Sequence, residues 1–188
     1  MITESVAREF TPLEEYEMLP EGTCAELIDG VIYDMSPAPL VQHQRLVMRI
    51  SNSIFNYIAG RKGKCEVFSS PFDVKLSDDT VVQPDVCVIC DPDKLTYRGC
   101  DGAPEWVIEI TSSNFVHDYV TKLGLYQKYG VKEYWIVNPK IETTIVYQFD
   151  ENCGLTEVVS YKFIENITVG IYKNREEPLV INIAAILG

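Results

Sequence analysis

Apolar residues recur with helical spacing in three parts of the chain. Between residues 42 and 59 they fall at intervals of three and four, which predicts an amphipathic helix with one face toward a core. A second helix is expected over residues 115–129, because residues 112–114 are candidate N-caps and a glycine follows. A short helix is expected from Thr11 to about Leu19, because Thr-Pro-Leu-Glu forms a capping box.

Other segments have the patterns of strands. Residues 86–90, 106–110 and 134–138 are nearly continuous apolar runs, as in the central strands of a sheet. Residues 72–76 alternate between apolar and charged, and residues 143–149 predict a further strand beside 134–138.

The order of these elements predicts the fold class. A hairpin is expected over residues 26–33, because Asp29-Gly30 is a type I′ turn signal, and further strands or a docking segment follow residue 155. A helix between two apolar strands implies a crossover and an at least partly parallel sheet. We therefore expect an α/β fold with a central mixed β-sheet flanked by helices, in one domain over residues 1–188. The N-terminal helix and hairpin would extend that domain.

Composition and charge narrow the possible environments and partners. The chain has 188 residues, 46% hydrophobic and 23% charged, which is an ordinary globular balance. Its net charge of −12 predicts weak nucleic-acid binding unless its cations cluster or a metal neutralises the site. No apolar run approaches the roughly 20 residues of a membrane span, and the first ten residues are polar. We expect a cytoplasmic protein without a membrane partner.

The six cysteines do not predict a zinc site. Cys87 and Cys90 have CxxC spacing, but residues three apart in a strand point to opposite faces, so they cannot chelate one ion. No second CxxC exists. We expect buried thiols in a reducing compartment.

Two carboxylates are candidates for a catalytic metal site. Glu109 interrupts an apolar strand, where an ionised carboxylate is costly unless it is paired or bound to a metal. Asp85 follows Pro84 at the start of another buried strand, and two carboxylates on adjacent strands suit Mg²⁺. The alternatives are a buried salt bridge at Glu109, or a strand end that reaches the edge of the sheet.

Three further residues are candidates: Lys122 as the third member of the site, and Glu26 and His43 as weaker candidates. Lys122 shares a helical stripe with apolar residues, so its ammonium could lie near the carboxylates, but it could also pair with Asp118 on a solvated edge. Glu26 is either a third carboxylate of the site or a solvent-facing hairpin residue. His43 lies on the apolar face of its helix, where a hydrogen-bonded core histidine is the alternative to a site residue.

Taken together, these residues resemble the PD-(D/E)XK nuclease superfamily, and more closely the restriction-endonuclease-like family called Uma-two. The resemblance runs from about Leu13 to the C-terminus. The matching pieces are Glu26-Leu-Ile-Asp-Gly30, Met35-Ser-Pro37, His43-Gln44, Pro84-Asp85, Glu109 with Ser112, Asp118 with Lys122, and Gly130-Val-Lys-Glu-Tyr-Trp-Ile-Val137.

The resemblance implies both a site and a reaction. It implies that Asp85, Glu109 and the backbone carbonyl of Ile110 hold Mg²⁺, with Mn²⁺ as a substitute, and that the chain is an endonuclease that hydrolyses DNA phosphodiester bonds. The lysine that the superfamily usually carries two residues after the glutamate is absent, since Thr111 stands there, and Lys122 is the expected replacement.

A second function class stays open at this point. The net charge and the threonine at position 111 favour a nuclease fold kept as a non-catalytic binding or interaction module. The sequence does not distinguish DNA from RNA as substrate, and it leaves the oligomeric state open, a homodimer included.

Overall fold

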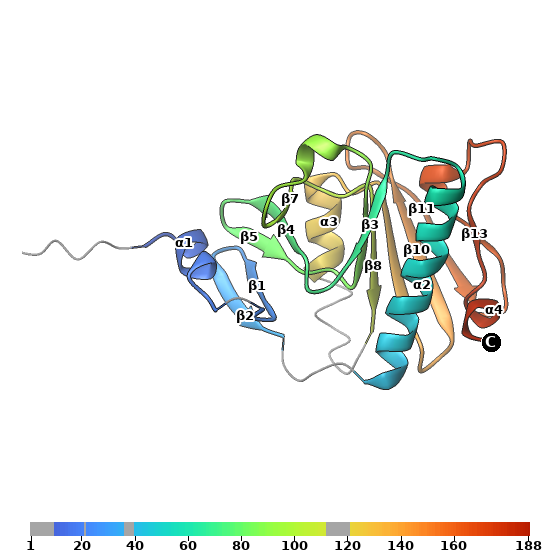
Figure 1. Ribbon diagram of the computed structural model, residues 1–188, viewed down its shortest axis with the longest axis horizontal. Coiled ribbons are helices and arrows are strands. Elements are labelled where there is room, and N and C mark those ends of the chain that lie inside the picture. Colours follow the sequence, from blue (N-terminus) through green and yellow to red (C-terminus); the bar gives the residue numbers. More distant parts are fainter. Residues whose placement is uncertain (1–9, 21, 36–39, 112–120) are drawn as a thin grey trace, which may run out of the picture.

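The described residues form a six-stranded, a five-stranded and a two-stranded β-sheet and four α-helices (Figure 1). The computed structural model describes residues 10–20, 22–35, 40–111 and 121–188. Within these ranges no helix is long and apolar enough to cross a bilayer. The helices are α1 (Pro12–Glu17), α2 (Val41–Gly60), α3 (Leu123–Tyr129) and α4 (Ile183–Leu187), with short 3-10 turns η1 (Pro92–Lys94) and η3 (Gly170–Tyr172).

The larger sheet has six strands in the order β11-β10-β9-β8-β6-β3. Among the described strands of this sheet, β8 and β9 are the one parallel pair. Helix α3 lies between them in the chain, so the expected crossover is present. The predicted central neighbours β6, β8 and β9 are adjacent. The strands are β3 (Glu66–Ser69), β6 (Val86–Ile89), β8 (Trp106–Ile110), β9 (Glu133–Asn138), β10 (Thr143–Phe149) and β11 (Leu155–Lys162).

The smaller sheet has five strands in the order β2-β1-β5-β4-β7. Its hairpin turns at Asp29 and Gly30, which both have the positive φ that a type I′ turn requires. Its strands are β1 (Ala25–Ile28), β2 (Val31–Asp34), β4 (Asp73–Ser77), β5 (Thr80–Val82) and β7 (Gly99–Asp101); β12 (Ile167–Thr168) and β13 (Val180–Ile181) pair separately.

The six-stranded sheet separates two hydrophobic cores. One face, which carries Ile108 and Ile110, packs against α2, α4 and the β12–β13 pair. The other face, which carries Val107, packs against α3 and the five-stranded sheet. Figure 1 shows α2 along one side of the sheet and α3 between the two sheets. Each residue of β8 therefore faces either α2 or α3, and the alternation of the strand decides which.

The structure corrects three details of the expected fold. The hairpin is not an appended extension, because β1 pairs with β5 through Leu27 and Val81. Strands β3, β5 and β7 were not predicted, because three or four residues are too few for a periodic signal. The helix expected over residues 115–129 is described only from position 121 onward, with residues 112–120 outside the described ranges.

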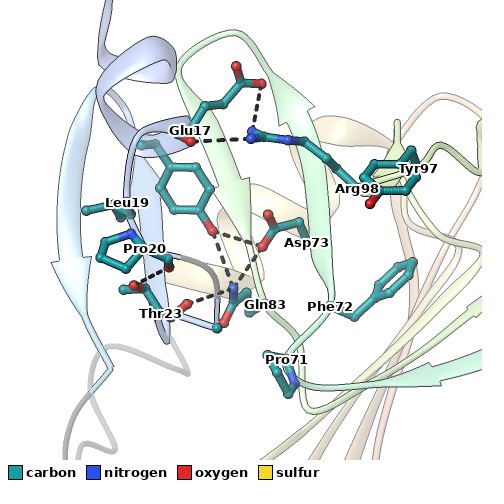
Figure 2. Close-up of a pocket in the computed structure, with 12 residues that line it drawn as sticks. Glu17, Leu19, Pro20, Thr23, Pro71, Phe72, Asp73, Gln83, Tyr97 and Arg98 are labelled. Atoms are coloured by element: carbon teal, nitrogen blue, oxygen red, sulfur yellow. Dashed lines mark hydrogen bonds and ion pairs between the residues drawn. The ribbon is translucent and has the colours of Figure 1, made fainter.

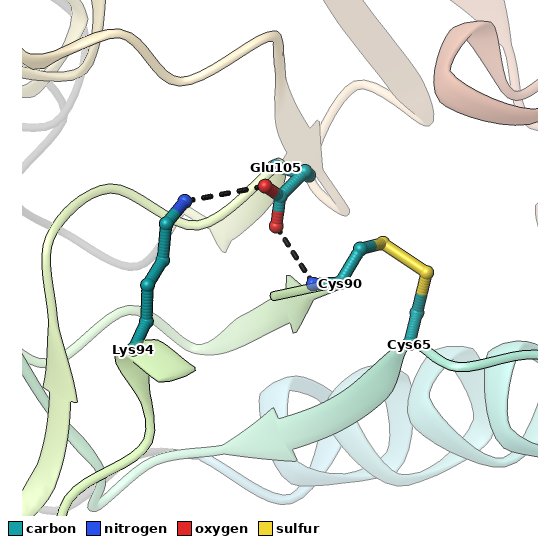
Figure 3. Close-up of a disulfide and its surroundings, with 4 residues drawn as sticks. All are labelled: Cys65, Cys90, Lys94 and Glu105. Carbon is teal, nitrogen blue, oxygen red and sulfur yellow. Dashed lines mark hydrogen bonds and ion pairs between the residues drawn. A yellow bond between two sulfur atoms is a disulfide. The ribbon is translucent and has the colours of Figure 1, made fainter. Parts of the chain in front are cut away.

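The cysteine prediction was wrong for one pair. Cys65 and Cys90 form a disulfide between the start of β3 and the end of β6 (Figure 3). Glu66 pairs with Ile89, so the next position along the ladder brings the two cysteines opposite each other. Such cross-strand proximity depends on sheet register and is invisible in sequence spacing. Cys87 is a buried free thiol, as expected.

Gly99→Ala should destabilise the contact between β4 and β7. A Cβ at Gly99 would lie 2.1 Å from the carbonyl oxygen of Asp73, so the two backbones would have to separate. We expect the free energy of unfolding to fall by about 1–3 kcal/mol, measured by urea denaturation. The matched control is Gly124→Ala in α3, where an added Cβ meets nothing within 4 Å and alanine favours the helix. Equal urea midpoints for Gly99→Ala and the unsubstituted protein would contradict this account.

Candidate active site

The two carboxylates predicted to form a site lie at one end of the six-stranded sheet. β6 and β8 are antiparallel with Val86 opposite Ile108, and one further step along this register brings Asp85 opposite Glu109. Asp85 is fixed there because its Oδ2 accepts the backbone N–H of Ile110 at 2.7 Å. The register of two central strands therefore places the acidic pair.

Strand alternation turns Glu109 toward α3. Ile108 and Ile110 belong to the core beneath α2, whereas Val107 belongs to the core beneath α3, and Glu109 shares the parity of Val107. Glu109 is 5% exposed, and its Oε1 accepts the hydroxyl of Tyr126 at 2.7 Å. Helix α3 thus covers the carboxylate that the sheet presents.

Lys122 connects two buried carboxylates. Its Nζ lies 3.0 Å from Oε1 of Glu109 and 3.0 Å from Oε1 of Glu26. The lysine is 2% exposed, so it does not lie on a solvated edge. Asp118, the alternative partner, is outside the described residues.

Glu26 belongs to the same cluster and does not face solvent. It is 2% exposed on β1, and its Oε1 also accepts the backbone N–H of Gln83 at 2.9 Å. Because β1 is a strand of the five-stranded sheet and Glu109 is on the six-stranded sheet, the Lys122 ammonium bridges the two sheets.

His43 reaches the acidic pair from α2. Its Nε2 lies 3.0 Å from Oδ2 of Asp85, while its Nδ1 is buried and has no hydrogen-bond partner among the described residues. The histidine is therefore not the fully satisfied core residue of the alternative interpretation. Five residues expected from the sequence converge here: Glu26, His43, Asp85, Glu109 and Lys122.

The electrostatics of the cluster favour a bound cation. Burial raises the pKa of Glu109, and the nearby charges of Asp85 and Glu26 raise it further, against the opposing effects of Lys122 and Tyr126. Burial alone would lower the pKa of Lys122, but the attraction of Glu109 and Glu26 is larger and raises it. Two carboxylates contact the one ammonium and Asp85 acts on Glu109 from nearby, so the cluster holds more carboxylates than lysines.

The same carboxylates shift the pKa of His43. Burial lowers its pKa, whereas the hydrogen bond to Asp85 and the charges of Asp85 and Glu109 raise it, and the net shift is upward. The positively charged imidazolium is thus stabilised beside Asp85.

The oxygen atoms that remain free fit a hard divalent cation. Oδ1 of Asp85 and Oε2 of Glu109 accept no hydrogen bond from any described residue. Within the described ranges there is no group of three or more His, Cys, Asp or Glu arranged as a ligand set. Mg²⁺ needs only one or two carboxylates, with other oxygens completing its shell, so this donor set fits it.

A second buried glutamate shows what a purely structural carboxylate looks like in this protein. Glu133 is fully buried on β9; its Oε1 accepts the indole N–H of Trp135 at 2.7 Å, and its Oε2 accepts the N–H of Ile171 at 2.9 Å. Both oxygens of Glu133 are satisfied, whereas Glu109 keeps one oxygen free. The contrast singles out Glu109 as the carboxylate with ligand-binding capacity.

Two contacts of the site were not predicted. Tyr126 does not stand out in the sequence as a site residue, although its position four residues after Lys122 indicates that the two side chains can share a contact. The hydrogen bond from the backbone N–H of Gln83 to Glu26 cannot be predicted from sequence, because every non-proline residue has a backbone donor.

Lys122→Met should destabilise the protein in a pH-dependent way. Glu109 has a pKa raised in the folded state, so the folded protein holds a proton that the unfolded chain releases. The contribution of this bound proton to the free energy of unfolding is complete below the unfolded-state pKa of glutamate, about 4.3. It is lost as pH rises through the folded-state pKa of Glu109. Removing the ammonium raises that pKa further. We expect a loss of about 3–5 kcal/mol at pH 8 and a smaller loss at pH 5, measured by urea denaturation.

The matched control for this substitution is Lys128→Met. Lys128 lies on α3 as well but is exposed, so its removal should change stability by less than about 1 kcal/mol at either pH. A pH-independent loss at Lys122 would contradict the assignment of Glu109 as the titrating group.

Comparisons with known proteins identify a family and a shared fold. A family model, Uma2, described as "Putative restriction endonuclease", matches residues 13–169. A crystal structure described as a "putative nuclease belonging to DUF820" from Anabaena variabilis ATCC 29413 superposes with a TM-score of 0.73 at 20% identity, over 95% of this chain and 98% of that one. This likeness shows a shared fold. None of the curated proteins compared with the chain matches it. From the family match, which spans most of the chain and includes all five site residues, we conclude that the chain belongs to the Uma2 family of restriction-endonuclease-like proteins.

Proposed function

We propose that this protein is a Mg²⁺-dependent nuclease that hydrolyses phosphodiester bonds in DNA. The observation that carries the proposal is the pairing of Asp85 and Glu109, each with one free oxygen, beside the buried ammonium of Lys122. The family match and the shared fold support nuclease-like function. The metal, the substrate and catalysis are our inference from the geometry.

The free oxygens of Asp85 and Glu109, with the carbonyl of Ile110, would hold the metal. When bound, Mg²⁺ would supply Lewis-acid chemistry by offsetting negative charge on the phosphate and by making a nearby water more acidic. The fixed position of Asp85 matters, because its Oδ2 is already held by His43 and by the N–H of Ile110. Only its other oxygen is left to bind, which restricts the ligand geometry.

Lys122 would donate a hydrogen bond to the attacking water or to a phosphate oxygen. Its Nζ has three protons, of which Glu109 and Glu26 use two. The same two carboxylates keep the ammonium charged and prevent it from changing rotamer. The buried position 111 holds a threonine, so it supplies no ammonium, and Lys122 takes that role from a helix.

His43 and Glu26 act through other residues, and we assign them positioning roles. His43 orients Asp85 from α2, and Glu26 orients Lys122 from β1. Removing either residue should disturb a geometry rather than delete a reacting group.

The distribution of charge reconciles an acidic chain with a polyanionic substrate. Residues 40–65 contain five cationic residues and no aspartate or glutamate, although the whole chain carries −12. Arg45 follows His43 by two residues in the first turns of α2, near the carboxylate cluster, whereas three of the cations follow the far end of that helix, where Arg61 pairs with Glu177. Clustered cations can attract a phosphate backbone despite the net charge. The five residues are Arg45, Arg49, Arg61, Lys62 and Lys64.

A non-catalytic nucleic-acid or protein-binding module is the second candidate function. The threonine at position 111 favours it, because the usual lysine of the superfamily is missing there. A cleavage assay distinguishes the two, since a binding module keeps its affinity without turning over substrate.

Asp85→Asn should abolish both metal binding and cleavage. The substitution removes the anionic ligand but keeps a side-chain oxygen for the N–H of Ile110, so the fold should persist. We expect cleavage of plasmid and single-stranded DNA in Mg²⁺ or Mn²⁺ to fall at least about a hundredfold. Mn²⁺ affinity, measured by electron paramagnetic resonance, should fall in parallel. The control Asp91→Asn, in the loop after β6, should leave both unchanged. Cleavage by Asp85→Asn at the unsubstituted rate would remove this site from the mechanism.

Lys122→Ala should abolish most cleavage while leaving metal binding largely intact, because the carboxylates remain. We expect a loss of at least about a hundredfold in single-turnover rate, with Mn²⁺ affinity equal to or higher than that of the unsubstituted protein. Circular dichroism checks that the variant is folded, and Lys122→Arg, which retains the charge, should recover part of the rate. Unchanged cleavage by a folded Lys122→Ala protein would eliminate the lysine from the mechanism.

A further inference from the structure

A cavity of about 710 Å³ lies on the side of the five-stranded sheet that α1 covers (Figure 2). It is bounded by the end of α1 and the loop that follows it, by the start of β4, and by the loop before β7. Its size falls within the range of small-molecule sites in proteins. The residues that matter for its chemistry are Tyr16, Phe72, Asp73, Gln83, Tyr97 and Arg98.

Gln83 belongs to both the cavity and the carboxylate cluster. Its backbone N–H binds Glu26, while its side-chain Nε2 binds Oδ1 of Asp73 in the cavity wall at 2.8 Å. Asp85 follows two residues later, so at most about 7 Å of backbone separates the two features. The Gln83 side chain faces Tyr16 on the α1 side of the five-stranded sheet, whereas Glu26 faces Lys122 on the other side, so a strand that reaches both features would pass around the end of β5.

The polar wall of the cavity presents a free acceptor. Oδ1 of Asp73 accepts from the Tyr16 hydroxyl at 2.9 Å and from Gln83, but Oδ2 has no hydrogen bond to any described residue. In Figure 2 the dashed lines that reach Asp73 end on one of its two oxygens. An anionic acceptor in a partly buried position selects ligands that carry N–H donors.

The opposite wall presents aromatic rings. Tyr97 is 105% exposed and stacks on no described ring, whereas Phe72 is held by stacking on Phe68 with ring centroids 4.3 Å apart. Figure 2 places Tyr97 and Phe72 across the cavity from Leu19 and Pro20. An aromatic side chain fully in water gains by stacking a planar ligand upon it.

Charge argues against a phosphate in the cavity itself. Arg98, the cation of the rim, is already paired with Glu17 at 3.4 Å and also donates to the backbone oxygen of that residue. With Asp73 nearby, the cavity is acidic. A planar group with N–H donors and no negative charge matches these walls.

We propose that this cavity binds an unpaired nucleobase with an exocyclic amine, from the strand whose phosphodiester lies at Asp85 and Glu109. The assignment rests on the proposed nuclease function for the identity of that strand. The amine donates to Asp73, in the same chemistry by which acidic side chains recognise the amino group of cytosine. A base inside a duplex cannot enter, so the substrate is single-stranded or has a base turned out of the stack.

The test uses the full chain without metal and measures the binding of nucleosides by nuclear magnetic resonance titration. Adenosine and purine riboside form a matched pair, because they share the ring and only adenosine carries the amine. We expect adenosine to bind about tenfold more tightly than purine riboside. Tyr97→Ala should weaken adenosine about tenfold, because base stacking on an aromatic ring is lost. The control Phe55→Ala, at an exposed ring on α2, should have no effect.

Asp73→Asn gives a second, more specific readout. Asparagine keeps the Oδ1 acceptor for Tyr16 and Gln83 but replaces the free oxygen with an amide NH₂ group, which donates and does not accept, so the preference for adenosine over purine riboside should be lost or reversed. No nucleoside binding up to the solubility limit, or equal binding by Tyr97→Ala and the unsubstituted protein, would overturn the assignment even if the protein cleaves DNA. Binding with the expected preferences in a protein that does not cleave would uphold the assignment and refute the proposed nuclease activity.

Discussion

The shared ammonium of Lys122 is the interaction on which the site depends. Glu26 comes from the five-stranded sheet and Glu109 from the six-stranded sheet, and neither carboxylate could stay buried and ionised without a cation. The lysine precedes α3, which packs between the sheets. The same contact therefore joins three structural layers and fixes the position of the charged groups.

This arrangement gives the site more carboxylates than lysines. The ammonium satisfies one oxygen of each of two carboxylates, and Asp85 is held by a histidine and a backbone N–H rather than by a lysine or arginine. The excess negative charge favours a divalent cation, and the free oxygens of Asp85 and Glu109 are where it would bind. Glu133, with both oxygens hydrogen-bonded, shows that the fold can bury a carboxylate without leaving a free oxygen.

The two surfaces that we propose for recognition carry opposite charge. Helix α2, which carries Arg45 and Arg49, begins at Val41 close to His43, whereas the acidic, aromatic cavity is lined by Gln83 on the other side of the five-stranded sheet. A polynucleotide has both a polyanionic backbone and neutral planar bases, so a cationic and an acidic surface on either side of one cluster are compatible with a single ligand.

The sequence by itself determined the long elements and the identities of the candidate residues. The apolar runs that became β6, β8 and β9 and the period of α2 are local signals, and Glu109 stood out because a carboxylate interrupts an apolar strand. Only the tertiary structure decided that the strands form two sheets, that Tyr126 binds Glu109, that Cys65 meets Cys90 and that a cavity opens beside Gln83. Each of these depends on register or packing between segments distant in the chain, which no local pattern encodes.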